Sequence, residues 1–158
     1  MKKNVIIIAI VVIIAIVIKI VAVNMDKNVN IDMQKLAEEL NNEKIFEDNL
    51  SQIDRDTIIK RYNFNSEKIK NINSYVGTGA TAEEILIIEL VDKKDRNEIE
   101  KIIETKLEER KADFQTYLPE EVFKLENYNL ESKGNYIILC VSNDYDKAKE
   151  IINKYTNS

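Results

Sequence analysis

The chain lacks histidine and tryptophan altogether, and it has one cysteine, one proline and three glycines among 158 residues. Without histidine it cannot build a catalytic triad that uses imidazole as general base, nor a zinc site rich in Cys and His. The single Cys140 excludes a disulfide within the chain, and its place between Leu139 and Val141 predicts a buried, inert thiol. We expect no cofactor, no metal site and no catalytic residue.

The chain also lacks an excess of positive charge. It has 23 basic and 28 acidic residues, a net charge of −5. All 28 acidic residues lie after residue 23, whereas Lys2, Lys3 and Lys19 lie before it, so residues 24–158 carry a net charge of −8. This balance argues against a nucleic-acid partner and against adhesion to an anionic bilayer surface.

One long hydrophobic run stands at the start of the chain. Val5 to Ile18 is unbroken Val, Ile and Ala, and Ile20 to Val23 extends the run past Lys19 to 19 positions. As a helix it spans about 28 Å, close to the roughly 30 Å of a bilayer core. We therefore expect residues 1–23 to form a single-pass transmembrane helix, a signal anchor that contacts the lipid bilayer through Val5 to Val23.

A cleaved secretory signal is the alternative for this segment. It requires small residues at positions −3 and −1 of a cleavage site, but Ala22 at −1 would put Ile20 at −3. Basic residues flank both ends of the run, so their count does not fix the orientation. The short head before the run favours a C-terminal domain outside the cytoplasm.

Residues 24–31 are polar and lack an apolar period, so we expect a tether, followed by an extracytoplasmic α+β domain over residues 32–158. Met33, Leu36, Ala37 and Leu40 have the spacing of an amphipathic helix behind Asp32 as N-cap. Asp54 or Asp56 caps a second, short helix with Ile58, Ile59 and Tyr62 facing inward.

The rest of the domain alternates strands and helices. We expect an edge strand at 66–76, a turn at 77–81, a central strand at 85–91 and a long helix that Asp95 caps and Pro119 ends. A bulged strand at 122–132, a turn at 133–135, a strand at 136–142 and a helix capped by Asp144 or Asp146 follow.

A shift of 49 residues places Asp95 on Asp144 and Ile102-Ile103 on Ile151-Ile152. This match suggests a duplicated strand-strand-helix unit. It predicts a four-stranded antiparallel sheet with helices packed on one face.

Period two sorts the side chains of the two central strands into two faces. One face is fully apolar and should meet the two long helices: Leu86, Ile88, Leu90, Ile137, Leu139 and Val141. The other face is too apolar to be left in water, so either the N-terminal helices cover it or it receives a partner. The candidate interaction residues on it are Ile85, Ile87, Glu89, Tyr136 and Ile138.

Several short motifs of the domain form one pattern: Arg61-Tyr62, Ala82-Glu83-Glu84-Ile85, Lys111 with Phe114, Tyr117 and Pro119, Lys133-Gly134-Asn135-Tyr136, and Asp144 with Lys147-Ala148. With them the stretch from about Tyr62 to Tyr155 resembles an uncharacterised family of Gram-positive, mostly clostridial, cell-surface proteins, known only as a domain of unknown function. The resemblance implies an extracytoplasmic domain, held as a lipoprotein or by an N-terminal membrane helix, with no established activity. The chain departs from the lipoprotein members because it lacks their acylated cysteine.

Other candidate sites are weak. Gly77-Thr78-Gly79-Ala80-Thr81-Ala82 matches G-x-G-x-x-A, but a strand follows where a dinucleotide-binding fold needs a helix, so we expect a hairpin turn. The pairs Glu83-Glu84 and Glu120-Glu121 do not point their carboxylates at one site. Asn143, Asp144 and Asp146 lack the remaining ligands of a calcium loop. The aromatic group Phe114, Tyr117 and Phe123 is expected in the core.

We therefore expect a membrane-anchored extracytoplasmic binding domain whose ligand is a protein or a cell-envelope component. One alternative is a hydrolytic enzyme that uses only carboxylates and tyrosines, for example Glu89 with Tyr136. Another is a structural subunit of a membrane complex.

Overall fold

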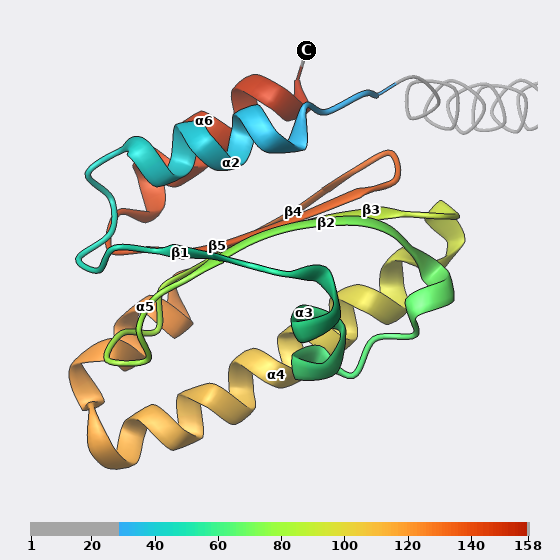
Figure 1. Ribbon diagram of the computed structural model, residues 1–158. Helices are drawn as coiled ribbons and strands as arrows, with labels where there is room; N and C mark the ends of the chain where they lie inside the picture. The colour runs from blue at the N-terminus through green and yellow to red at the C-terminus, as the bar shows by residue number, and fades with distance from the viewer. Residues whose placement is uncertain (1–28, 158) are drawn as a thin grey trace, which may run out of the picture.

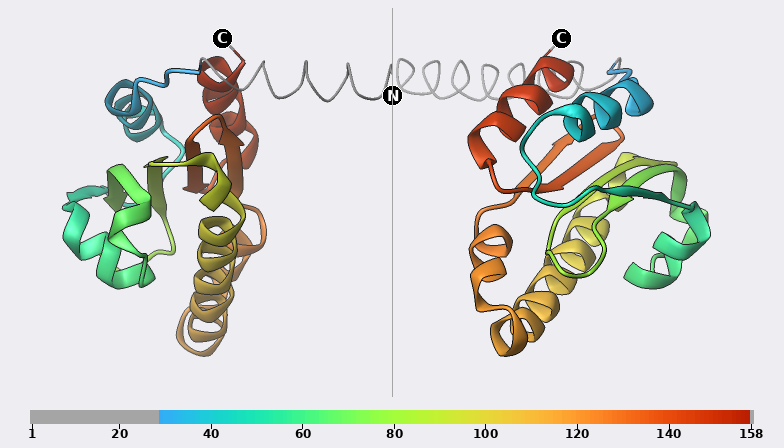
Figure 2. Two further views of the ribbon diagram at one scale, coloured as in Figure 1. Left: turned by 90° about the vertical axis from the view of Figure 1, so that its right-hand side faces the viewer. Right: turned by 60° about the vertical axis from the view of Figure 1, so that its left-hand side comes forward.

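A five-stranded antiparallel sheet lies between two layers of helices in the computed structural model, which describes residues 29–157. Helices α2 (Met33–Asn42) and α6 (Tyr145–Thr156) cover one face of the sheet. Helices α3 (Arg55–Tyr62), α4 (Arg96–Tyr117) and α5 (Val122–Glu126) cover the other (Figures 1 and 2). The predicted α+β class is confirmed.

The strand order is β1-β2-β3-β5-β4, with every neighbouring pair antiparallel. The strands are β1 (Ser51–Ile53), β2 (Ile69–Val76), β3 (Glu84–Leu90), β4 (Asn129–Lys133) and β5 (Tyr136–Val141). The expected four strands are therefore wrong by one. The three-residue β1 has no sequence signal of its own. It pairs with Ser74–Val76 and so moves β2 away from the edge.

Three aspartates cap the N-terminal ends of α2, α3 and α6, as predicted. The carboxylates of Asp32, Asp54 and Asp144 accept hydrogen bonds from the backbone N–H groups of Lys35, Thr57 and Lys147. Asp95 precedes α4 but makes no capping bond with its side chain, which instead pairs with Lys68 at 3.2 Å. Short 3-10 turns complete the chain at Ser66–Lys68, Lys93–Asp95 and Pro119–Glu121.

The expected bulged strand at 122–132 is wrong in its first half. Pro119 opens a 3-10 turn that leads directly into α5, and only Asn129–Lys133 forms the strand β4. Helical geometry puts Leu125 in the core and leaves Phe123 exposed. Two acidic residues, Glu120 and Glu121, favour this helical turn because they lie at its positive end.

The prediction that the helices pack on one face is also wrong. The order strand-strand-helix occurs twice, as β2-β3-α4 and β4-β5-α6, but α4 and α6 lie on opposite faces (Figure 1). A two-fold axis that exchanges the antiparallel neighbours β3 and β5 runs perpendicular to the sheet, so it would keep both helices on one face. The two units are therefore not related as a structural duplicate.

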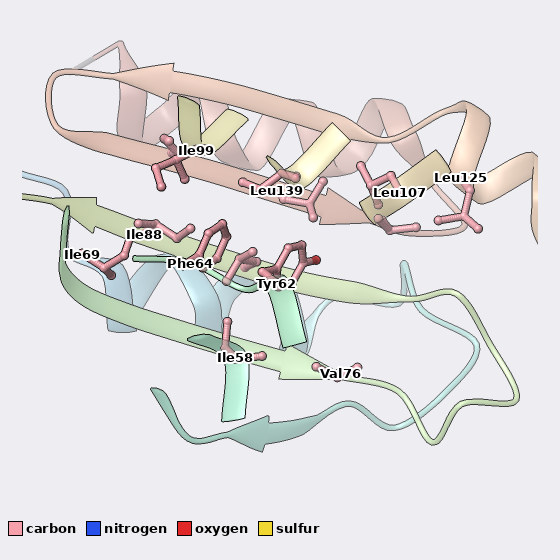
Figure 3. Packing of buried hydrophobic residues seen from close by; sticks show 14 of the residues in the cluster. Ile58, Tyr62, Phe64, Ile69, Val76, Ile88, Ile99, Leu107, Leu125 and Leu139 are labelled. Atoms are coloured by element: carbon pink, nitrogen blue, oxygen red, sulfur yellow. The ribbon is translucent and has the colours of Figure 1, made fainter. Parts of the chain in front are cut away.

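The face of Leu86, Ile88 and Leu139 packs against α3, α4 and α5 in one apolar cluster (Figure 3). The second cluster lies on the other face, beneath α2 and α6, and includes four of the five candidate interaction residues: Ile85, Ile87, Tyr136 and Ile138. These side chains are buried, so this face is not open to a partner while α2 and α6 are in place. Two-sided burial explains why β3 and β5 read as continuous apolar runs.

Cys140 lies in the second cluster and is fully buried, as expected. Burial raises the pKa of its thiol to about 12. The thiol is therefore protonated at neutral pH, and because the thiolate is the nucleophile it is inert.

No helix within residues 29–157 is both long and apolar enough to cross a membrane. The predicted anchor at 1–23 and most of the tether at 24–31 lie outside the described residues.

A buried ionic cluster joins α5 to the start of β3. The side chain of Lys124 is 3% exposed, and its Nζ lies 3.1 Å from Glu83 and 3.0 Å from Glu121. Burial alone would lower the pKa of Lys124, but the hydrogen bonds to Glu121 and Glu83 outweigh it and raise that pKa. The ammonium therefore stays charged between the two carboxylates.

Lys124→Met tests this cluster. It leaves the carboxylates of Glu83 and Glu121 buried without their counter-ion, so we expect the free energy of unfolding to fall by about 3–5 kcal/mol in urea denaturation. Lys44→Met, at an exposed lysine, is the matched control and should change it by less than about 0.5 kcal/mol. Equal stability of the two variants would contradict a structural role for the cluster.

Candidate functional site

Asp48 holds the loop between β2 and β3. Its Oδ2 accepts hydrogen bonds from the backbone N–H and the hydroxyl of Thr78, each at 2.7 Å. These bonds, the backbone one first, lower the pKa of Asp48 below its usual value of 3.8. The backbone N–H of Gly77 donates to the carbonyl of Glu83 at 3.2 Å and closes the loop.

The structure explains why glycine stands at two positions of the loop. Gly79 has a φ of 93°, in the region that favours glycine. A Cβ on Gly77 would lie 2.7 Å from the hydroxyl oxygen of Thr81 and 3.0 Å from Oδ2 of Asp48. The G-x-G-x-x-A segment is thus a hairpin loop, as predicted, and not the start of a helix.

A pocket of about 330 Å³ lies between this loop, the end of α3 and the second half of α4. We call it the loop pocket. The loop contributes Thr78 and Thr81, and its other lining residues include Arg61 and Tyr62 from α3 and Lys106, Arg110, Asp113, Phe114 and Tyr117 from α4.

The basic side chains of the loop pocket differ in how they are held. Arg110 donates to Oε2 of Glu84 at 2.6 Å and to the carbonyl of Ala82 at 2.8 Å. Lys106 pairs with Glu109 at 2.5 Å. Arg61 has neither a hydrogen-bond nor an ion-pair partner among residues 29–157, so its guanidinium is available to a ligand.

Tyr62 adds a buried polar group to the pocket. Its ring stacks on Phe64 with centroids 5.0 Å apart, and its hydroxyl points away from Phe64 (Figure 3). Only 1% of the residue is exposed. The hydroxyl lies beside the carboxylate of Glu84, but neither it nor Oε1 of Glu84 makes a hydrogen bond of normal geometry in the described structure. Burial, and then the negative charge of Glu84, raise the pKa of Tyr62 well above 10, so the hydroxyl keeps its proton.

An aromatic wall completes the pocket. The rings of Phe114 and Tyr117 lie 5.1 Å apart at an angle of 32°. Phe114 is buried as predicted, but Tyr117 and Phe123 are 57% and 59% exposed, so their expected place in the core is wrong. The ring of Tyr117 therefore presents an apolar surface beside polar groups, a combination typical of ligand sites.

The structure places the proposed carboxylate-tyrosine pair side by side in the sheet, but the two side chains bond to other residues. Glu89 and Tyr136 are partners in the register of β3 and β5. However, the carboxylate of Glu89 binds Lys70 and Asn71, while the hydroxyl of Tyr136 bonds to Asn30. One glutamate of each acidic pair noted in the sequence, Glu83 and Glu121, does lie in a common cluster. The buried Lys124 bonds to both of their carboxylates and separates them.

Across the part of the chain that the structure describes, no group of three or more Asp, Glu or Cys residues could hold a metal ion. Asp144 caps α6, which accounts for the acidic residues that resembled a calcium loop.

Residues 42–142 match the family model described as a domain of unknown function (DUF4358). Because the match covers more than half of the chain, the protein belongs to this family. Neither the curated proteins nor the solved structures give a significant match to the chain.

The family match contains the whole sheet and every residue that lines the loop pocket, from Arg61 to Tyr117. It ends before α6 and includes only the last residue of α2. This pocket cannot be recognised in the sequence because its residues come from three separate segments. The one available signal was the group Arg61, Tyr62, Phe114 and Tyr117, which carried the family resemblance without any indication of contact.

Asp48→Asn tests how the loop is held. The lowered pKa of Asp48 means that its carboxylate stabilises the folded state at pH values well above 3.8. That contribution is lost as the pH falls through the lower pKa of the folded state. We therefore expect the variant to unfold at lower urea concentration than the native protein at pH 6, and the difference to shrink below pH 3.8. A difference that is constant over pH 3–6, or absent at pH 6, would contradict this role.

Proposed function

We propose that this protein is a membrane-anchored, extracytoplasmic binding domain whose ligand site is the loop pocket. The anchor is supported by the apolar run Val5 to Val23, which has the length of a bilayer span. The setting on a Gram-positive cell surface, expected from the resemblance, is part of the same proposal. The observation that carries the binding role is a pocket in which a buried hydroxyl and an unpaired guanidinium adjoin exposed aromatic surface.

The ligand that fits is small, with an acidic group at one end and an apolar group at the other. Arg61 and the proton of the Tyr62 hydroxyl are suited to a carboxylate or a similar anion, because both are donors. Tyr117 and Phe114 are suited to the apolar part. Asp113 is the only carboxylate among the lining residues, whereas most glycoside hydrolases use a pair of carboxylates.

Cell fractionation tests the anchor. We expect the full chain to stay with the membranes after an alkaline carbonate wash, and a variant without Val5 to Val23 to be soluble. Protease added to intact cells should digest the domain. A mature protein that begins near Val23, or release of the full chain by the wash, would contradict the anchor.

Phenylacetate tests the pocket, because it joins a carboxylate to a single ring. In NMR spectra of the isotope-labelled full chain in detergent micelles, we expect millimolar phenylacetate to shift the amide signals of Thr78 and Gly79. Acetate and 2-phenylethanol each lack one of the two groups and should have much weaker effects.

Arg61→Gln should weaken phenylacetate binding about tenfold, the effect of losing one charge-assisted hydrogen bond. Lys60→Gln changes the net charge equally on the same helix but lies outside the pocket, so its binding should be that of the native protein. Shifts that are the same in both variants would contradict the site.

A further inference from the structure

A second pocket, of about 360 Å³, lies at the outer edge of the sheet and takes no part in the proposed function. We call it the edge pocket. Residues of β4, α4, the end of α5 and the start of α6 line it. The side chains that matter are Glu104, Glu126, Tyr128, Asn129, Glu131 and Tyr145.

Asn129 supplies a buried acceptor without a partner. The residue is 2% exposed, and its Nδ2 donates to the backbone carbonyl of Tyr145 at 3.0 Å. The opposite orientation of the amide would place its oxygen against that carbonyl, so the assignment of nitrogen and oxygen is fixed by the hydrogen bond. The remaining atom, Oδ1, makes no hydrogen bond, and a buried acceptor in that state costs free energy unless a donor reaches it.

The carboxylates around Asn129 are only partly neutralised. Glu126 pairs with Lys111 at 3.2 Å. The carboxylates of Glu104 and Glu131 make no ion pair and no hydrogen bond with any residue from 29 to 157, although Glu131 is close enough to Lys149 to raise the pKa of that ammonium. Burial, and then the negative charges of Glu104 and Glu108, raise the pKa of Tyr128, whereas Lys111 lowers it.

One ammonium group of the chain already lies at the rim of the edge pocket. Nζ of Lys149 bonds to the hydroxyl of Tyr145 at 3.2 Å and lies 5.4 Å from the centre of its ring. Cations are attracted to aromatic faces at this range. Tyr145 thus already binds one cation of the chain, which also lies within the field of Glu131, so a ligand ammonium at this wall would share Tyr145 with Lys149 or displace it.

We propose that the edge pocket binds an organic cation with a primary ammonium group. An ammonium has three N–H donors and no acceptor, and the pocket offers an amide oxygen and two carboxylates that lack donors. A metal ion fits less well, because no three acidic side chains within the described residues are placed to bind one. The ammonium comes either from a free amine or from a lysine side chain of a peptide.

Two probes separate these sources: cadaverine, as a free diamine, and a Gly-Lys-Gly peptide blocked at both ends. With the isotope-labelled full chain in detergent micelles, we expect at least one probe at millimolar concentration to shift the side-chain NH₂ signals of Asn129 and the amide signals near Glu131. Shifts from cadaverine alone assign a free amine, and shifts from the peptide assign a lysine side chain.

Glu104→Gln combined with Glu131→Gln should weaken the binding more than tenfold, since it removes both unpaired charges and keeps the size of each side chain. The control is Glu120→Gln with Glu67→Gln, two exposed glutamates outside the pocket with the same total change of charge. Equal weakening in both pairs, no shift with either probe, or equally large shifts with Mg²⁺ would each overturn the proposal. None of these results bears on the loop pocket, which has its own probe.

Discussion

The structure depends on how three residues, Ala82, Glu83 and Glu84, enter the sheet. The backbone N–H of Ala82 donates to Glu121, and its carbonyl accepts from Arg110. The carboxylate of Glu83 accepts from Lys124 and from two backbone N–H groups, those of Glu47 and Asp48. Glu84 completes the set with its bond to Arg110. Charged groups buried to this degree persist because they are paired, and among these carboxylates Oε1 of Glu84 is the atom left without a hydrogen bond in the described residues.

This constraint connects segments that are far apart in the chain. Three segments bond to residues 82–84. They are residues 47 and 48, helix α4 through Arg110, and helix α5 through Lys124. Asp48, whose N–H binds Glu83, uses its side chain to hold Thr78 in the loop. Arg110, whose position the same segment fixes, forms part of the loop-pocket wall. The buried hydrogen bonds of residues 82–84 thus help to position two parts of the pocket, the loop and Arg110.

Elements with their own local signal could be predicted from the sequence. Helices α2, α3 and α6 have an aspartate cap and an apolar period, and β3 and β5 are continuous apolar runs. The errors fall where tertiary contacts decide. Strand β1 has only three residues and forms because it can pair with the edge of β2. The apolar period of α6 predicts a helix but does not say which face of the sheet the helix covers.

The candidate sites were harder to predict for a related reason. Sequence patterns pointed to Ile85, Ile87 and Ile138 because the second sheet face is apolar, but α2 and α6 bury it. The residues of the loop pocket look ordinary in the sequence, since Arg61 and Asp113 belong to polar helix faces. Only the packing of α3 beside α4 shows that they share one cavity. An unsatisfied buried atom, such as Oδ1 of Asn129, has no sequence signal at all.

The layer formed by α2 and α6 has a consequence for how the domain is presented. The two helices lie side by side, joined by the bonds of Glu39 with Lys154 and Tyr155, and residue 29 enters the domain at this layer (Figure 1). The layer of α3, α4 and α5, with the loop pocket, lies on the far side of the sheet. The proposed anchor would therefore join the domain on the side of α2 and α6, with the whole sheet between that point of attachment and the loop pocket.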